Sequence, residues 1–252
     1  MTEPYLLVQL SDLHGGGTWG GPDPIAALER AVASVLALPQ LPDAVVVTGD
    51  LTDAGLDAEY EAVRSALEPL GSVHVLPGNH DDRDALRRAF GLAGDPGAPV
   101  HYATDLGPLR LVALDTTRPG EDGGELDRER LDWLDAELSA APGRPTLLAM
   151  HHPPFPTGIP ALDVIGIPAA DRAALADVVR RHPQVRRIVA GHVHRAISAE
   201  VGGCVAFSAP STYVQLRLDF ATTEIEVGGD PAGFAVHALL DGELVSHVQP
   251  LP

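Results

Sequence analysis

Five short apolar segments in this sequence are each followed at once by side chains that can bind a metal ion. Each segment is rich in branched aliphatic residues and has the length of a single β-strand. In an open α/β sheet the loops at the carboxyl ends of the strands converge, and ligands bind there. This pattern predicts that polar residues far apart in the sequence meet in one cleft. The five segments are YLLVQL (5–10), AVVVTG (44–49), SVHVLP (72–77), TLLAM (146–150) and RRIVAG (186–191).

Amphipathic segments that favour helices separate most of these strands. Asp23 followed by Pro24 predicts an N-cap with a proline at the first helical position. Several strands, with LRLVALD (109–115) among them, are apolar almost throughout, as expected when both faces of a sheet are covered. The sequence therefore predicts a mixed α/β sandwich. The expected helices span residues 23–38, 57–70, 81–90, 126–141 and 169–182.

The segment from about residue 200 to residue 252 differs from the rest of the sequence. VGGCVAFSAP (201–210), TEIEVGG (223–229) and GFAVHALLDGELVSHVQPL (233–251) have strand-like patterns, with glycine and Asp-Gly turn signals between them. We expect a C-terminal β-hairpin region there. No repeat, low-complexity linker or change of composition marks a boundary, so residues 1–252 are predicted to form a single domain.

The charge of the chain limits its partners. With 17 basic and 35 acidic residues the formal net charge is -18, which opposes binding to a nucleic-acid polymer or to an anionic membrane surface. Cys204 is the only cysteine, so no intrachain disulfide can form. No apolar run reaches the length of a membrane span, and the N-terminus lacks the pattern of a signal peptide. A cytoplasmic protein is the expectation.

The polar residues behind the strands form a set of oxygen and imidazole groups without a thiolate. Such a set suits manganese, iron, zinc or nickel rather than a cysteine-based structural zinc site. In Asp12-x-His14 and His192-x-His194, an extended backbone would turn both side chains of a pair to the same face. Six of the eleven histidines belong to the set. Its members are Asp12, His14, Asp50, Asn79, His80, Asp81, His151, His152, His192 and His194.

Short motifs in a fixed order resemble a known family of enzymes, the calcineurin-like metallophosphoesterases. Within that superfamily the chain most resembles the bacterial class III cyclic-nucleotide phosphodiesterases, through HHPPFPTGIPALDVIG (151–166) and SAPSTYVQ (208–215). The resemblance implies an α/β fold, namely a four-layer α/β/β/α sandwich of two mixed β-sheets flanked by helices. The motifs that match the five family signatures are SDLHGG (11–16), GD (49–50), GNHD (78–81), HH (151–152) and GHVH (191–194).

The resemblance also implies two divalent or trivalent transition-metal ions, with Mn2+, Fe2+/Fe3+ or Zn2+ as the candidates. A hydroxide between the ions would attack phosphorus in line. His80 would protonate the leaving alkoxide, which makes His80 and the bridging Asp50 the expected catalytic residues. The implied ligands are Asp12, His14, Asp50 and His194 for the first ion, and Asp50, Asn79, His151 and His192 for the second.

The implied activity is hydrolysis of a small phosphodiester, with 3′,5′-cyclic nucleotides such as cAMP preferred. A glycerophosphodiester or another small phosphodiester is the alternative substrate, because enzymes of that type share the five motifs. The third possibility is a scaffold of the same fold that binds partners without catalysis, but the complete ligand set argues against it. The exposed hairpins expected near the C-terminus would allow a homodimer.

Four positions have roles that the sequence leaves between alternatives. His152 either supports the site from behind or touches the substrate, and Asp81 could orient the ring of His80. Thr212 either borders the substrate or packs between a strand and a loop. Trp19 either lines the substrate pocket or holds its glycine-rich loop. The loops expected to face the substrate span residues 15–22, 154–167 and 208–230.

Overall fold

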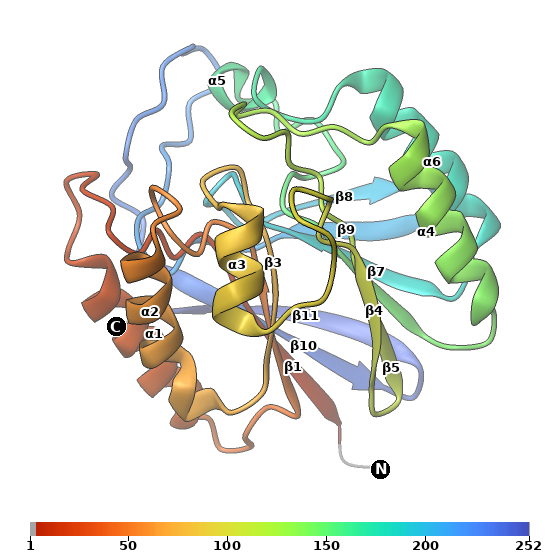
Figure 1. Cartoon of the computed structure of the whole chain (residues 1–252), viewed down its shortest axis with the longest axis horizontal. Helices are drawn as coiled ribbons and strands as arrows, with labels where there is room; N and C mark the ends of the chain where they lie inside the picture. The colour runs from red at the N-terminus through yellow and green to blue at the C-terminus, as the bar shows by residue number, and fades with distance from the viewer. Residues whose placement is uncertain (1–3, 252) are drawn as a thin grey trace.

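Two mixed β-sheets lie face to face at the centre of the computed structural model, which describes residues 4–251 (Figure 1). The first sheet contains β1 (Tyr5–Leu10), β2 (Ala44–Thr48), β3 (Val73–Leu76), β10 (Gly233–Leu240) and β11 (Glu243–Pro250), in the order β11-β10-β1-β2-β3. The second sheet contains β4 (Tyr102–Leu106), β5 (Leu109–Ala113), β6 (Thr146–Ala149), β7 (Val185–Ala190), β8 (Ile197–Val201) and β9 (Cys204–Ser208), in the order β4-β5-β6-β7-β9-β8.

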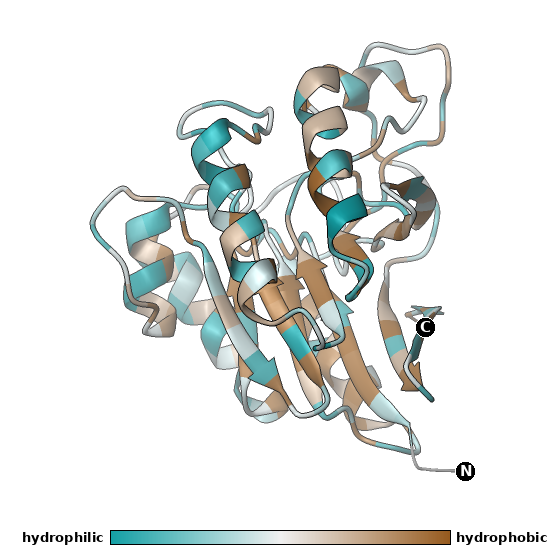
Figure 2. Cartoon of the chain, turned by 90° about the vertical axis from the view of Figure 1, so that its right-hand side faces the viewer, coloured by the Kyte–Doolittle hydropathy of each residue, from teal (hydrophilic) through white to brown (hydrophobic). Residues whose placement is uncertain are grey.

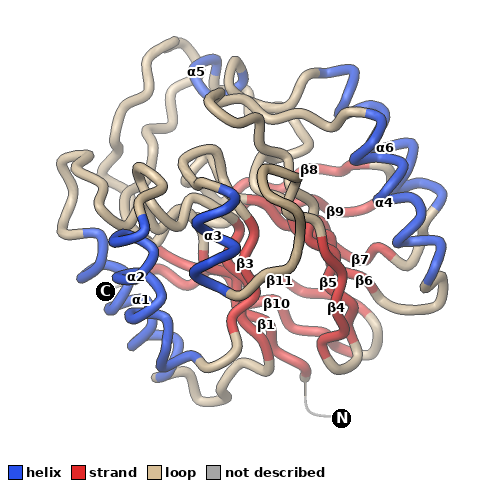
Figure 3. The backbone as a smooth tube through the Cα atoms, viewed as in Figure 1, coloured by secondary structure: helices blue, strands red, loops and turns tan. Residues whose placement is uncertain are grey.

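Helices cover the outer faces of both sheets and complete the four layers that the resemblance implies (Figure 3). Asp23 caps the first helix as predicted, because its Oδ1 accepts a hydrogen bond from the N–H of Ala26 at 2.8 Å. On the first sheet lie α1 (Pro24–Leu36), α2 (Asp57–Leu67) and α3 (Arg83–Phe90), and on the second lie α4 (Arg128–Ala140) and α6 (Ala169–Arg181). Two short helices are the 3-10 helix η1 (Glu68–Leu70) and α5 (Pro160–Asp163).

Strand residues alternate between two buried environments, which explains why the strands are apolar almost throughout (Figure 2). Val45 and Val47 of β2 face the helices of the first sheet, whereas Val46 faces the second sheet. In the same way Leu148 of β6 faces α4 and α6, and Leu147 faces the first sheet. Three apolar layers therefore join the two sheets and their helices into one stack.

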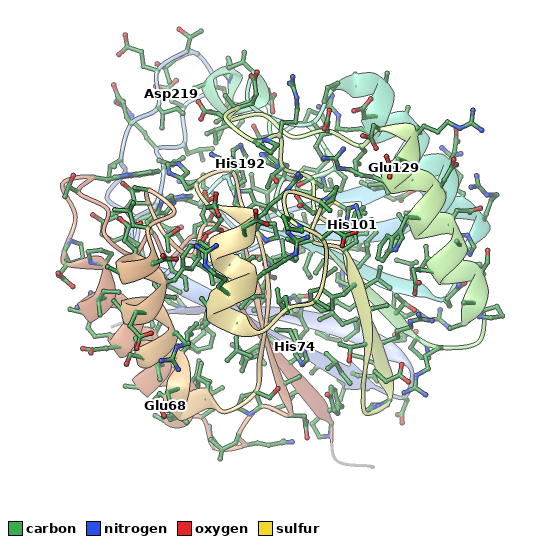
Figure 4. All side chains as sticks on the ribbon, in the orientation of Figure 1. Glu68, His74, His101, Glu129, His192 and Asp219 are labelled. Atoms are coloured by element: carbon green, nitrogen blue, oxygen red, sulfur yellow. The ribbon has the colours of Figure 1, made fainter. Side chains whose placement is uncertain are left out.

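The strand ends that carry the polar residues are brought together by parallel pairing. In the first sheet β1, β2 and β3 run parallel, and in the second β5, β6, β7 and β9 do so. The carboxyl ends of neighbouring strands therefore lie at the same edge of each sheet. The loops that follow them meet in the middle of the molecule, where Figure 4 labels His192.

The structure departs from the sequence expectations at the edges of the sheets. The edge strands β4 and β8 were not expected, because half-buried edge strands carry a weak apolar pattern. Residues 223–229, expected as a strand, form only an isolated bridge between Leu216 and Val227. The hairpin expected in residues 233–251 is present as β10 and β11, which turn at Asp241 and Gly242. No helix within residues 4–251 combines the length and the apolar character needed to cross a membrane.

A polar bridge joins the two sheets. We assign a neutral His237 whose Nε2–H donates to Gln9 Oε1 at 3.0 Å and whose Nδ1 accepts from the Ser246 hydroxyl at 2.8 Å. The Gln9 amide donates to Thr48 Oγ1 at 2.9 Å and to the Ala190 carbonyl at 2.8 Å. Because Thr48 and Ala190 are the last residues of β2 and β7, this network links the C-terminal hairpin to the strands that lead into the site.

Replacing His237 with glutamine is expected to reduce the loss of stability in acid. Burial, with Arg187 and His247 nearby, lowers the pKa of His237 from 6.5 to about 3. Below about pH 6.5 the unfolded chain therefore binds this proton while the folded chain does not, and stability falls by about 1.4 kcal/mol per pH unit. Urea unfolding at pH 6.5 and pH 5 should show the native chain losing about 2 kcal/mol more than His237→Gln. Equal losses would contradict a buried neutral histidine.

Candidate metal centre

The candidate ligands converge at the carboxyl ends of five strands from both sheets, namely β1, β2, β3, β6 and β7. Asn79 lies at the centre of contact, because its Oδ1 is 3.1 Å from His151 Nε2 and 3.0 Å from His192 Nδ1. The structure therefore brings together all seven ligands that the resemblance implies. The groups whose ligating atoms lie within 4.8 Å of one another include Asp12–His14–His194, Asp12–Asp50–His151 and His14–Asp50–His80.

Four histidines share one arrangement, in which one ring nitrogen donates to a protein oxygen and the other turns to the centre. In its neutral form an imidazole has a single N–H, so the inward nitrogen of each neutral ring carries a lone pair. The inward Nε2 atoms of His14 and His194 are only 3.0 Å apart, a contact between two acceptors that a shared cation would satisfy. The outward hydrogen bonds run from His14 Nδ1 to Asp53 Oδ1, His151 Nδ1 to the Thr48 carbonyl, His192 Nε2 to the Ile165 carbonyl and His194 Nδ1 to the Val214 carbonyl.

The backbone is left-handed at five of the candidate ligands. The φ angles are 53° at Asp12, 46° at His14, 50° at Asp50, 68° at His192 and 48° at His194. The backbone therefore does not stay extended through the Asp-x-His and His-x-His pairs, and the members of each pair reach the centre from left-handed residues instead. Such conformations cost about 1–3 kcal/mol each and persist where the surrounding structure holds them, typically at functional sites.

Glycines let the backbone come close to these side chains. A Cβ at Gly49, whose φ is 92°, would lie 2.4 Å from His151 Nδ1. A Cβ at Gly78 would lie 2.1 Å from Asp50 Oδ1. Neither contact is possible, so both positions need glycine for the centre to assemble.

The ionisation of the centre reflects burial and close carboxylates. Burial raises the pKa of Asp12 to about 6 and lowers the pKa of His194 to about 4. At His151, burial alone would lower the pKa, but the Asp50 carboxylate beside it raises that pKa to about 9, so a metal ion that binds there must displace the proton on the inward nitrogen. Asp12 Oδ2 is buried and has no hydrogen-bond partner among the described residues. Two buried carboxylates beside imidazole lone pairs fit a cation in this position.

His152 lies behind the centre. Its Nδ1 accepts from the Thr116 hydroxyl at 2.8 Å, and its Nε2–H donates to the Asp122 carbonyl at 3.1 Å. Although its ring nitrogens lie near those of His151 and His192, both are engaged, which leaves no lone pair for an ion. The His152 ring packs 4.4 Å from the ring of His192, centroid to centroid, and so supports that side chain.

Asp81 does not orient His80, so that expectation is wrong. The His80 ring donates instead from Nδ1 to the backbone carbonyl of Asp53 at 2.8 Å. The Asp81 carboxylate stabilises the turns around the centre. Its donors are the N–H groups of Leu51, Thr52 and Gly78 and the hydroxyls of Thr52 and Tyr60.

Asp53 is a site residue that the sequence reasoning missed. Its Oδ1 accepts from His14 Nδ1 at 3.1 Å and from Trp19 Nε1 at 2.9 Å, while its carbonyl holds His80. The Trp19 ring stacks on His194 with centroids 5.4 Å apart. Trp19 therefore both lines the site and is held there. The only sequence signal for Asp53 was its place three residues after Asp50.

Replacing Asp53 with alanine is expected to lower metal affinity by about tenfold to a hundredfold, because His14 loses the acceptor that fixes its tautomer. Chelator competition with Mn2+ measures that affinity directly. Asp53→Asn, which keeps an acceptor oxygen, should recover part of the loss. Asp57→Ala, at an exposed carboxylate paired with Arg88, is the control and should bind Mn2+ like the native chain. An unchanged affinity in Asp53→Ala would contradict the positioning role.

A cavity of about 430 Å³ opens over the centre. Thr212 does not line it, because that residue is fully buried and its N–H donates to the Ser11 carbonyl at 3.2 Å. Of the two roles expected for Thr212, the structure agrees with packing between a strand and a loop and not with substrate contact. The lining residues are Trp19, Asp50, Asn79, His80, Asp122, Ile165, His192, His194, Leu216, Ile225 and Val227.

The sandwich fold with buried histidines and carboxylates at its strand ends defines a metal-binding class of α/β protein. The model of the calcineurin-like phosphoesterase family matches residues 5–196, and the chain therefore belongs to that family. The chain is 36% identical over 235 residues to a probable cyclic nucleotide phosphodiesterase from Rhodococcus erythropolis, covering 89% of this chain and 75% of the relative.

Two further comparisons broaden this picture. A probable glycerophosphodiester phosphodiesterase from Arcobacter nitrofigilis is 32% identical over 221 residues, covering 85% of this chain and 81% of the relative. The solved structure of a dimetal phosphatase from Danio rerio has a TM-score of 0.71 at 17% identity, covering 99% of this chain and 98% of that one. The similarity to the Danio rerio structure supports the four-layer sandwich fold predicted from the sequence.

Proposed function

We propose that this protein is a metal-dependent phosphodiesterase that hydrolyses 3′,5′-cyclic nucleotides, with cAMP preferred. The observation that carries the proposal is the convergence of inward imidazole lone pairs on two buried carboxylates and the Asn79 oxygen. A centre of that composition, beneath an open cavity, suits an anionic ester. The similarity to a probable cyclic nucleotide phosphodiesterase supports the choice of substrate.

The donor set fits two transition-metal ions, for which Mn2+, Fe2+/Fe3+ and Zn2+ are the candidates. The proposed ligands are those named from the resemblance, with Asp50 shared between the ions. When bound, such ions supply Lewis acidity and a nucleophilic water. Asp12 and Asp50 bring two negative charges against at least four positive ones, so the loaded centre stays positive within an acidic protein and attracts the phosphodiester.

His80 is the proposed proton donor to the leaving oxygen. Its ring lines the cavity, and the hydrogen bond from Nδ1 to the Asp53 carbonyl directs Nε2 away from that loop. Burial alone would lower the pKa of His80, but the Asp50 carboxylate raises it above the ordinary value. A larger fraction of His80 then carries a proton near neutral pH, as a general acid requires.

A glycerophosphodiester is the second candidate substrate, favoured by the similarity to the Arcobacter nitrofigilis protein. Steady-state assays of the Mn2+-loaded protein on cAMP and glycerophosphocholine separate the two. We expect the higher kcat/KM on cAMP, whereas faster glycerophosphocholine turnover would establish the alternative. Absence of turnover on both, and on bis-p-nitrophenyl phosphate, with metal bound would refute a phosphodiesterase. The cytoplasmic location and the homodimer stay predictions.

A further inference from the structure

Resting on the proposed function, we infer that an aliphatic wall beside the metal centre holds a flat, apolar ester group and selects nucleoside phosphodiesters over choline esters. The cavity has two kinds of lining. Besides candidate ligands of the centre, it is lined by Leu216, Ile225 and Val227, which we call the aliphatic wall. No lysine or arginine of the described chain lines this cavity, whose acidic lining residues are Asp50 and Asp122, and the aliphatic wall itself carries no charge.

The aliphatic wall is built from a paired segment near the end of the chain. Leu216 and Val227 form an isolated antiparallel bridge, which places their side chains next to each other. Ile225 lies two residues before Val227, and both line the same cavity. Three apolar side chains from residues 216–227 therefore line the same cavity as the candidate metal ligands.

Hydrogen bonds hold this segment in place. The N–H of Arg217 donates to the Glu226 carbonyl at 2.8 Å, and the N–H of Gly228 donates to the Gln215 carbonyl at 2.7 Å. The guanidinium of Arg217 also pairs with the Glu226 carboxylate at 2.6 Å. In Figure 1 the segment is the blue loop near α5, and Figure 4 labels Asp219 on it. These contacts within residues 215–228 hold the aliphatic wall in position.

Packing supports one end of the wall and leaves the other open. Leu216 is only 4% exposed and packs with Ile159, Leu162 and Val193. Ile225 and Val227, in contrast, are 52% and 43% exposed beside the cavity. An apolar group bound there would remove this surface from water, which favours binding without any directional contact.

A choline group would require a different lining. Quaternary ammonium ions bind in cages of several aromatic faces. Among the described residues, Trp19 is the only Trp, Tyr or Phe that lines this cavity, and its ring already stacks on His194. A nucleobase has two flat faces that an aliphatic surface covers well. The wall therefore matches the base of a nucleotide better than it matches a small cation.

Two esters that release the same leaving group test this selectivity. They are thymidine 5′-(p-nitrophenyl phosphate) and p-nitrophenylphosphorylcholine, both assayed with the Mn2+-loaded protein. We expect a higher kcat/KM on the nucleoside ester. Ile225→Ser and Val227→Ser should each lower the nucleoside-to-choline ratio by about tenfold. Both side chains are exposed, so their replacement leaves the core intact, and thermal unfolding checks this.

Leu218→Ser is the matched control, because Leu218 belongs to the same loop, is 53% exposed and does not line the cavity. Its ratio should equal that of the native chain, and Ile225→Val should keep most of the selectivity. An unchanged ratio in both wall variants, or an equal drop in Leu218→Ser, would overturn the inference. If the native protein hydrolyses neither ester, the proposed phosphodiesterase fails instead.

Binding of adenosine tests the wall without catalysis. The chain has two tryptophans, so Trp133→Phe leaves Trp19 in the cavity as the only tryptophan reporter. We expect adenosine to change Trp19 fluorescence saturably, with a Kd about tenfold higher after Ile225→Ser and unchanged after Leu218→Ser. If the Kd for adenosine were the same with Ile225→Ser as with the native Ile225, the proposed role of the aliphatic wall would be overturned even if both esters are hydrolysed.

Discussion

Replacing His80 with alanine is expected to lower kcat on cAMP by about a hundredfold to ten-thousandfold. The ribose alkoxide is a poor leaving group and needs the proton that His80 supplies. The loss on bis-p-nitrophenyl phosphate should be less than about tenfold, because p-nitrophenolate leaves without protonation. Steady-state rates on both substrates, at saturating substrate and Mn2+, measure the difference between the two losses.

His74→Ala is the matched control for His80→Ala. His74 lies on β3, the strand that leads into the same motif, and Figure 4 labels it well below His192. Its replacement should leave the ratio of the two rates at the native value. Equal losses on both substrates in His80→Ala would argue against proton donation. A loss of bound Mn2+ in that variant would instead make His80 a contributor to the metal site.

Replacing Asp50 with asparagine is expected to remove the stabilisation by Mn2+ and to lower activity by about a hundredfold to a thousandfold. Asp50 is 2% exposed, and its Oδ2 lies 3.7 Å from His14 Nε2 and 3.3 Å from His151 Nε2. Its charge is thus central to both proposed ions. At about 100 times the dissociation constant, Mn2+ should stabilise the native chain by about 2.7 kcal/mol.

Thermal unfolding with and without Mn2+ measures this stabilisation independently of turnover. Asp241→Asn is a suitable control, because Asp241 lies in the β10–β11 turn at a φ of 48° that asparagine tolerates. It should keep the full rise in melting temperature. If Asp50→Asn kept that rise as well, Asp50 would not be a shared ligand.

The sequence predicted most of the strands, and the convergence of the candidate ligands at the strand ends, because both depend on local patterns. An apolar run such as TLLAM must be buried on both faces, and His151 directly after it must then lie at a strand end. Parallel pairing makes the ends of neighbouring strands coincide, so several runs of this kind predict one cleft. The order of the motifs indicated the family, and the resemblance to that family implied the roles expected of Asp50 and His80.

Other features depend on contacts that no local pattern encodes. The left-handed turns at Asp12 and His192 result from close approach between loops of different sheets, as in the bond from the His192 N–H to Asp12 Oδ1. Asp53 positions His14 and Trp19 only because the folded chain brings both side chains within hydrogen-bond distance of its carboxylate. Residues 223–229 alternate like a strand, but their pairing with the segment around Leu216 is limited to a single bridge, so a ladder does not form.

The pairing of β1 with β10 has a consequence for how the protein is made. Tyr5–Leu10 leaves the ribosome long before its antiparallel partner, Gly233–Leu240, is synthesised. Contacts of such long sequence separation slow folding. Ser11 and Asp12 follow a strand, β1, whose β10 edge stays unpaired until Gly233–Leu240 has been made. A nascent chain of this protein therefore exposes an unpaired strand edge, the kind of edge at which chains pair wrongly and aggregate.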